Sequence, residues 1–245
     1  MNKSGTFFEL IEAMSEPGCP VCRLVDKSVR SRIDAYFYEQ LNIIERRAEI
    51  REARGFCSAH ASLLPGPARM AGTAILHHDI LNDVARQIAA LAPRRTGSFA
   101  SVLALALRGA IRNVRDAVVP RRNCVLCDYE RDQEVIYLRA LARDIKDKRL
   151  YEAFRASAGL CLPHFQTALG VGDVAVDHLA MLIDLEVAHI EQARDELAAY
   201  MRKSNGSYDD QGPDRGAGFS PEEADSPLRA TRMVSGRILR VDGRR

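Results

Sequence analysis

All six cysteines of this 245-residue chain belong to a pattern that two histidines complete. The sequence reads Cys-x2-Cys, 34 residues and Cys-x2-His, and then repeats that order with an interval of 33 residues. Thiolates and imidazoles are ligands that zinc prefers, and Cys3His is typical of a closed structural site. We therefore predict two metal sites, one within each copy: Cys19, Cys22, Cys57 and His60 in the first, and Cys124, Cys127, Cys161 and His164 in the second.

Zinc is the expected cofactor, with two ions per chain and Zn–S and Zn–N distances of about 2.3 and about 2.0 Å. An iron–sulfur cluster held by the same side chains is the alternative. Four protein ligands close a tetrahedral site to substrate. The chain also lacks a nucleophile elbow, a phosphate-binding loop, a dinucleotide fingerprint and a His-Glu-x-x-His motif. We therefore expect no catalytic residues and no enzyme activity.

Charged side chains near the ligands allow two further hypotheses. Arginines close to them in sequence would either donate to the sulfurs or stay on the surface; these are Arg23, Arg54, Arg121 and Arg122. A separate basic series would bind nucleic acid in the weakest functional alternative; it comprises Arg108, Arg112, Arg115, Arg121 and Arg122. Glu186 and His189 have the spacing of a di-iron ligand pair, but the first copy offers no match, so a hydrogen-bonded or surface role is expected.

The segments between the ligand pairs are predicted to be helical hairpins. From Leu24 to Leu41 apolar residues recur every three or four positions without glycine or proline, which is typical of an amphipathic helix. A second helix over residues 44–53 would end at Gly55, which suits a helix C-cap. The second copy predicts helices over 128–143 and 146–157, with Gly159 as the stop. Each hairpin would return its chain to the first ligand pair.

Further helices are expected to pack around these hairpins. Long helices should follow each Cys-x2-His pair, over residues 69–91 and 174–202. An extra helix over residues 99–119 should lead into the second Cys-x2-Cys pair, and its shorter counterpart over residues 6–14 should precede the first. The fold class predicted is therefore all-α, with two tandem homologous units, 1–92 and 99–203, joined by a linker at 93–98. Residues 204–245 are rich in Gly, Ser, Pro and Asp at their start and are expected to be a disordered tail.

The composition of the chain bears on its binding partners and on its location in the cell. The 35 basic and 33 acidic residues leave a net charge of +2, which gives no global preference for nucleic acid or an anionic membrane. The amino terminus lacks a secretory signal, and no apolar run is long enough for a membrane span. A cytoplasmic location without membrane insertion is therefore expected, and in a reducing compartment paired cysteines favour metal binding over disulfides.

The segments GCPVCRLVDKSVRSRIDAYFYEQLN and ARGFCSAHASLL resemble an uncharacterised bacterial and archaeal family of tandem Cys-Pro-x-Cys and Gly-Phe-Cys-x-x-His repeats, over roughly residues 8–202. The resemblance implies no activity. The second copy departs from the family pattern at Val125 and Leu160, which replace Pro20 and Phe56 of the first copy, so a looser loop is expected there.

The leading functional hypothesis is an interaction or regulatory module that binds a protein partner and is stabilised by zinc. An iron–sulfur or thiol redox protein is the alternative, and a nucleic-acid-binding regulator comes after both.

Overall fold

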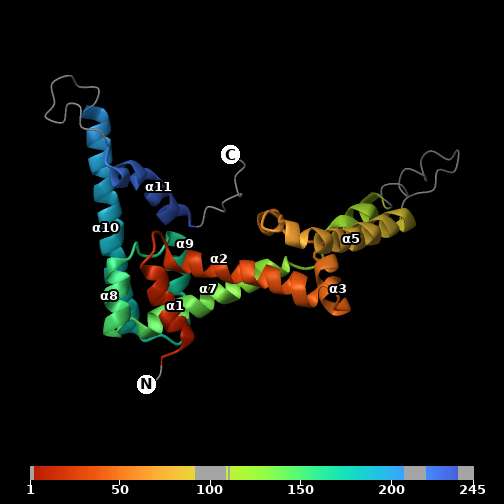
Figure 1. Ribbon diagram of the computed structural model, residues 1–245, viewed down its shortest axis with the longest axis horizontal. Coiled ribbons are helices and arrows are strands. Elements are labelled where there is room, and N and C mark those ends of the chain that lie inside the picture. Colours follow the sequence, from red (N-terminus) through yellow and green to blue (C-terminus); the bar gives the residue numbers. More distant parts are fainter. Residues whose placement is uncertain (1–2, 92–108, 110, 207–218, 237–245) are drawn as a thin grey trace. The chain divides into compact units, whose positions relative to one another are not determined.

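The computed structural model describes residues 3–91, 109, 111–206 and 219–236, drawn as ribbon in Figure 1. Every regular element in these ranges is helical, so the predicted all-α class is confirmed. The predicted linker at 93–98 and most of the helix expected over 99–119 lie outside the described residues. None of the helices in the described ranges combines the length and apolar character needed to cross a bilayer.

Two compact units make up the chain, and each contains residues from both copies of the sequence pattern. Of the described residues, unit 1 comprises 3–28, 131–206 and 219–236, whereas unit 2 comprises 29–91, 109 and 111–130. The boundaries fall inside two helices, α2 (Pro20–Ala35) and α7 (Val125–Asp144). The structural units therefore differ from the sequence repeats.

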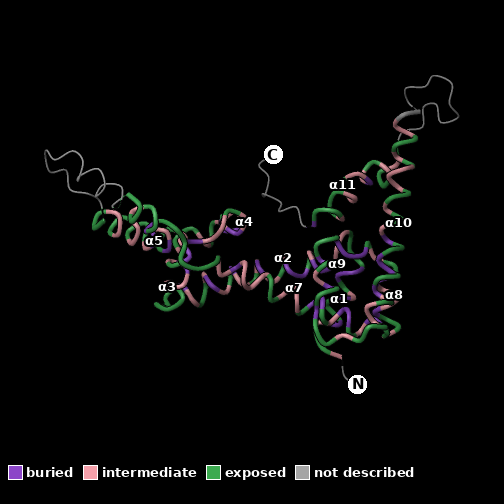
Figure 2. The backbone as a smooth tube through the Cα atoms, turned by 180° about the vertical axis from the view of Figure 1, so that it is seen from behind, coloured by how far each residue is buried: buried purple, intermediate pink, exposed green. Residues whose placement is uncertain are grey.

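Unit 1 is a helical assembly around an apolar core (Figure 2). Its helices besides the ends of α2 and α7 are α1 (Gly5–Met14), α8 (Lys148–Ala156), α9 (Leu162–Leu169), α10 (Val176–Gly206) and α11 (Pro221–Ser235). Helix α1 packs against α8, and α11 packs against both α10 and α9. The core consists of large side chains with no solvent exposure, among them Phe7, Leu10, Leu138, Leu150, Phe154 and Leu182. This core fixes the elements that carry the first group of ligands.

Unit 2 is a second helical assembly, around a smaller core. After α2 the chain forms a π-helical turn, η1 (Tyr36–Gln40), and then α3 (Ile44–Glu52), so the break predicted near residue 41 is confirmed. The remaining elements are α4 (Ser58–Ala61), a 3-10 turn η2 (Pro67–Arg69) and α5 (Met70–Leu91). The core consists of Tyr36, Leu41, Ile50, Leu76 and Ile80. An ion pair of 2.9 Å between Arg51 and Asp79 joins α3 to α5.

Two parts of residues 204–245, where a disordered tail is expected, are helical: the end of α10 and the whole of α11. Local chemistry explains α11: Ser220 and Glu223 form a reciprocal capping box, and Pro221 occupies the first turn. The helix also has a surface to pack against on α10. Composition alone hid this signal because the residues between the two helices are rich in glycine and aspartate. Residues 207–218 and 237–245 lie outside the described part of the chain.

Candidate metal centres

The eight predicted ligands converge in two groups, and each group combines the Cys-x2-Cys pair of one copy with the Cys-x2-His pair of the other. Site 1 consists of Cys19, Cys22, Cys161 and His164, and site 2 consists of Cys57, His60, Cys124 and Cys127. The prediction of two Cys3His groups is confirmed. The prediction that each group forms within one copy is wrong, and metal binding itself stays a prediction.

Helix lengths explain why the ligands of one copy do not meet. In the second copy, α7 has 20 residues, and from Cys127 to its end it carries the chain about 26 Å, at roughly 1.5 Å per residue. Helix α8 has only 9 residues and returns the chain by about 14 Å. The first copy is similar, with 16 residues in α2 and 9 in α3. Neither hairpin is symmetric, and neither brings Cys161 or Cys57 into one group with the pair that precedes it.

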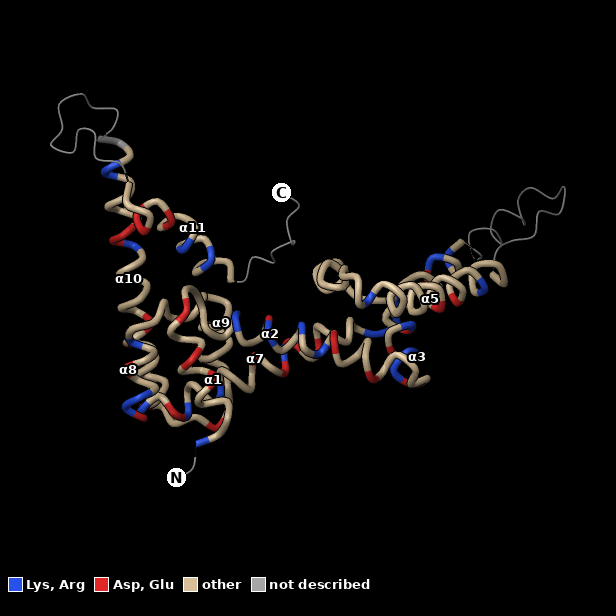
Figure 3. Tube along the Cα trace, viewed as in Figure 1, with Lys and Arg blue, Asp and Glu red and all other residues tan. Residues whose placement is uncertain are grey.

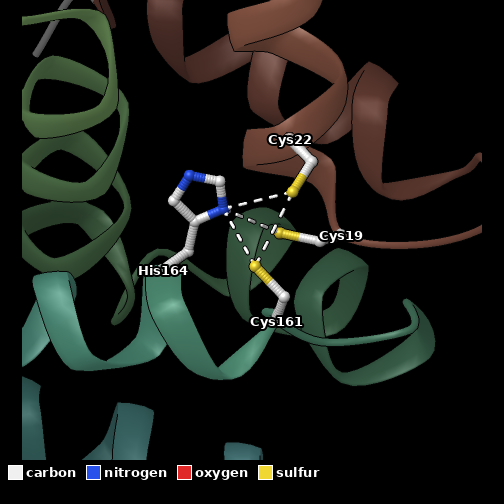
Figure 4. Close-up of side chains that lie close together, drawn as sticks. All are labelled: Cys19, Cys22, Cys161 and His164. Atoms are coloured by element: carbon white, nitrogen blue, oxygen red, sulfur yellow. Dashed lines mark hydrogen bonds between the residues drawn. The ribbon is translucent and has the colours of Figure 1, made fainter. Parts of the chain in front are cut away.

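Site 1 lies inside unit 1, where its four ligand atoms point toward a common centre (Figure 4). The His164 Nδ1 atom lies 3.4 Å from the Cys19 sulfur, 3.3 Å from that of Cys22 and 3.1 Å from that of Cys161. The sulfurs of Cys22 and Cys161 are 3.6 Å apart. This separation is much longer than the roughly 2.05 Å of a disulfide, and all six cysteines are free.

Site 2 lies inside unit 2 and has nearly the same geometry. The His60 Nδ1 atom lies 3.2 Å from the sulfur of Cys57, 3.7 Å from that of Cys124 and 3.4 Å from that of Cys127. The sulfurs of Cys57 and Cys127 are 3.6 Å apart. A regular tetrahedron with metal bonds of 2.3 and 2.0 Å has edges of roughly 3.5 Å between sulfur and nitrogen and roughly 3.8 Å between sulfurs. Both groups therefore have the size of a shell around one ion.

Helix amino termini surround both sites. Helix α2 begins at Pro20 and α7 begins at Val125, in each case directly after the first cysteine of a Cys-x2-Cys pair. Cys57 is the N-cap of α4, and Cys161 is the N-cap of α9. The partial positive charge at a helix amino terminus stabilises thiolates. The replacement of Pro20 by Val125 does not prevent this arrangement.

Two glutamates on α7 contact the histidines from the side opposite the sulfurs. The Nε2 atom of His60 lies 3.1 Å from a carboxylate oxygen of Glu130. The Nε2 atom of His164 lies 3.3 Å from that of Glu134. A carboxylate on one imidazole nitrogen leaves the other nitrogen free to bind a metal. Sequence analysis missed both glutamates, although Glu130 follows Cys127 by three positions on one helix face.

The titration of these groups reflects their mutual proximity. Burial by itself lowers the pKa of His60, but hydrogen bonds with Cys124 and Glu130 outweigh burial and raise the pKa to about 10. Burial also lowers the pKa of His164, but its contacts with thiols and a carboxylate outweigh burial and raise the pKa to about 12. For Cys127, burial and neighbouring thiols raise the pKa to about 12. A metal ion must displace protons from such groups, so its affinity increases with pH.

The arginines near the ligands contact groups other than the sulfurs. These contacts are Arg23 with the Pro17 carbonyl (2.8 Å), Arg54 with Asp83 (2.7 Å), Arg121 with Gln87 (3.0 Å) and Arg122 with Glu49 (3.9 Å). Of the series proposed for nucleic acid, Arg112 and Arg115 are exposed, whereas Arg108 lies outside the described residues. Figure 3 shows acidic and basic residues interspersed along α3 and α5.

Glu186 and His189 on α10 hold the segment that leads to Cys161. The Glu186 carboxylate is completely buried and accepts a hydrogen bond of 3.0 Å from the Leu160 backbone N–H. Gly159 has a φ of +71°, and a Cβ there would lie 2.6 Å from the His189 ring. Neither side chain joins a candidate ligand group in the described ranges. The His189 Nε2 atom lies 3.4 Å from the Arg155 carbonyl oxygen, so the expected hydrogen-bonded role applies to both side chains.

The model of a family of unknown function, DUF6062, matches residues 1–216 and so includes both copies of the ligand pattern. No curated protein and no solved structure matches the chain.

Proposed function

The chain belongs to the family DUF6062, and we propose that it is a helical interaction module that holds one structural Zn²⁺ in each site. The observation that carries the proposal is the convergence of three thiols and one imidazole, with all ligand atoms within 4.8 Å of one another, at two places in the chain. Four protein ligands complete a tetrahedral shell, and such closed shells are typical of structural zinc.

The spacing of the sulfurs favours a single ion over a multi-iron cluster. The cysteines of an iron–sulfur cluster bind different irons, which places their sulfurs farther apart than the edge of a one-ion tetrahedron. Here the sulfurs of Cys22 and Cys161 are 3.6 Å apart, as are those of Cys57 and Cys127. A redox cluster is thus the second candidate.

The ions would join segments that are distant in sequence. Cys22 and Cys161 are 139 positions apart, and Cys57 and Cys127 are 70 positions apart. Helix α4 has only 4 residues, too few to be stable without tertiary contacts. Structural zinc contributes its binding free energy to folding, so the ion at site 2 would stabilise connections that the small core of unit 2 supports weakly.

A role in protein binding is supported by apolar residues on the surface of unit 2. On α5, Ile75 is 48% exposed and Leu81 is 66% exposed, and both lie on the helix face opposite the buried Leu76 and Ile80. Closed metal sites leave no position for substrate, whereas apolar surface of this kind favours a protein partner.

Elemental analysis combined with native mass spectrometry of the untagged full chain tests the zinc assignment. We expect two zinc ions per chain, and we expect their removal by a chelator to reduce the helical circular dichroism signal. A brown protein with iron and absorbance near 400 nm after anaerobic purification would support the redox candidate. Salt-dependent binding of random duplex DNA would support the nucleic-acid hypothesis instead.

A further inference from the structure

Helix α11 lies beyond residue 216, where the family match ends, and packs onto two helices of unit 1. It is a well-delimited helix, with the Ser220 capping box at its start and Gly236, at φ +78°, as its C-cap. Its surface of contact is formed by α10 and α9. The chain thus supplies both a groove and the helix that occupies it.

Charge complementarity and ring stacking fix α11 on α10. The Arg229 guanidinium donates to the Glu196 carboxylate at 2.7 Å, and Lys203 donates to Glu223 at 2.8 Å. Figure 3 shows acidic and basic residues along both helices. The rings of Tyr200 and Phe219 stack with centroids 4.6 Å apart. These pairs set the position and direction of α11 along the groove.

The carboxyl end of α11 covers site 1. A Cβ at Gly236 would lie only 3.4 Å from the Cys161 sulfur and 3.5 Å from Pro163. Cys161 is 1% exposed, whereas its equivalent in the first copy, Cys57, is partly exposed. Between α10, α11 and the segments that carry Cys19 and Cys161 lies a cavity of about 130 Å³. The packing between α11 and these segments is therefore incomplete, which is expected for a helix that can dissociate from α10 and α9.

We propose that α11 is an intramolecular ligand of a helix-docking groove formed by α10 and α9, and that its departure uncovers the thiols of site 1. The groove fits an amphipathic helix that carries an acidic first turn and an arginine near its middle, as α11 does with Glu222, Glu223 and Arg229. The inference that α11 controls metal exchange at site 1 rests on the proposed zinc sites. The inference that α11 controls how accessible the thiols of site 1 are does not depend on zinc.

Site-resolved thiol labelling of the full chain tests the proposal. The protein is treated with N-ethylmaleimide, and peptide mass spectrometry gives a rate for each cysteine. Arg229→Glu places a carboxylate beside Glu196 and Asp225, and we expect it to speed labelling of Cys161 by up to about fivefold, the factor that corresponds to the loss of about 1 kcal/mol for an ion pair. Labelling of the site 2 cysteines should not change.

Two variants and a peptide separate docking from a general loss of structure. Arg155→Glu disrupts a surface pair with Glu152 in the same unit and should leave all rates unchanged. Combining Arg229→Glu with Glu196→Arg should restore most of the protection. A synthetic peptide of residues 219–236 should restore protection of Cys161 in the Arg229→Glu chain by occupying the vacated groove.

Unchanged labelling of Cys161 in Arg229→Glu would overturn the proposal, as would a failure of the peptide to protect that variant. Labelling is also carried out after zinc removal, because a covered thiol reacts slowly with or without an ion. If the full chain holds no zinc yet Arg229→Glu still exposes Cys161, the zinc assignment fails and the docking proposal survives. If zinc is bound and the rates do not respond, only the docking proposal fails.

Discussion

Each site depends on a histidine whose two ring nitrogens have different partners. In site 1 the Nδ1 atom of His164 faces the three sulfurs, while Nε2 faces Glu134 at 3.3 Å. In site 2, Glu130 takes the same position beside His60. A carboxylate on Nε2 holds the proton there, orients the ring and increases the basicity of Nδ1. The glutamates therefore support the two Cys3His groups although they are not among the candidate ligands.

Replacing Glu134 with alanine should weaken zinc binding at site 1 by roughly 10- to 100-fold, because a partner that orients a metal-bound histidine typically contributes that much. Chelator competition followed by native mass spectrometry gives the affinity of each ion. Site 2 is the internal control, and Glu152→Ala on the surface of α8 is the matched variant. Equal losses at both sites would contradict the assignment of Glu134 to site 1.

The two glycines before the Cys-x2-His pairs provide a matched test of packing. Gly55 and Gly159 both have positive φ values, +95° and +71°, so alanine at either position destabilises the backbone by about 1 kcal/mol. A Cβ at position 159 would also lie 2.6 Å from His189, whereas at position 55 its nearest neighbour is Ile80 at 3.7 Å. Gly159→Ala should therefore lower the free energy of unfolding more than Gly55→Ala in chemical denaturation. Equal effects would show that α10 moves to accommodate the methyl group.

Among the helices, α11 is the one whose docking depends most clearly on charge. A hydrogen bond with Arg229 lowers the pKa of Glu196, and a hydrogen bond with Lys203 lowers the pKa of Glu223. A carboxylate with a lowered folded-state pKa contributes stability above its unfolded pKa and loses it as pH falls through the folded value. Docking of α11 should therefore be strongest near neutral pH.

Hydrogen exchange of residues 221–235, corrected for intrinsic rates, should lose protection as pH falls below the ordinary glutamate pKa of 4.5. Ordered salt bridges that weaken on protonation are the physical reason. Glu196→Gln removes one of the two titrating groups and should make this loss smaller. An unchanged pH profile in that variant would mean that protonation of Glu196 does not control the docking of α11.

For the whole molecule, the crossed ligand sets mean that neither copy of the pattern completes a site alone. Site 1 takes Cys19 and Cys22 from the first copy and Cys161 and His164 from the second, and site 2 does the reverse. Zinc would therefore connect both copies twice. Loss of one ligand should affect a segment in the other copy, even though the two are distant in sequence.

Cys57→Ser tests the crossed grouping. We expect the variant to hold one zinc ion, because site 2 loses a ligand, and we expect maleimide labelling of Cys124 and Cys127 to accelerate. Labelling of Cys19 and Cys22 should stay at the level of the unmodified chain. Faster labelling of Cys22 with unchanged Cys124 would instead indicate ligand sets that form within one copy.

The sequence alone determined the ligand types and most of the helices. The periodicity after Leu24, the stops at Gly55 and Gly159, and the two copies of Cys-x2-Cys and Cys-x2-His are local signals. The structure has helices where these signals predict them, and it gathers the same eight cysteines and histidines into two Cys3His groups. Local signals also existed for α11, in Ser220, Pro221 and Glu223. The glycine-rich composition of the preceding residues obscured them.

Only the tertiary structure decided which ligands meet. Both copies contain the same Cys-x2-Cys and Cys-x2-His pairs. The sequence spacing is therefore compatible with ligand sets within one copy and with crossed sets, and periodicity cannot distinguish the two. The outcome depends on the unequal lengths of α7 and α8, with 20 and 9 residues, and on packing between segments distant in sequence. The pairing of Glu134 with His164 and the burial of Cys161 beside Gly236 have the same origin. Such contacts arise from the path of the whole chain, which local propensity does not specify.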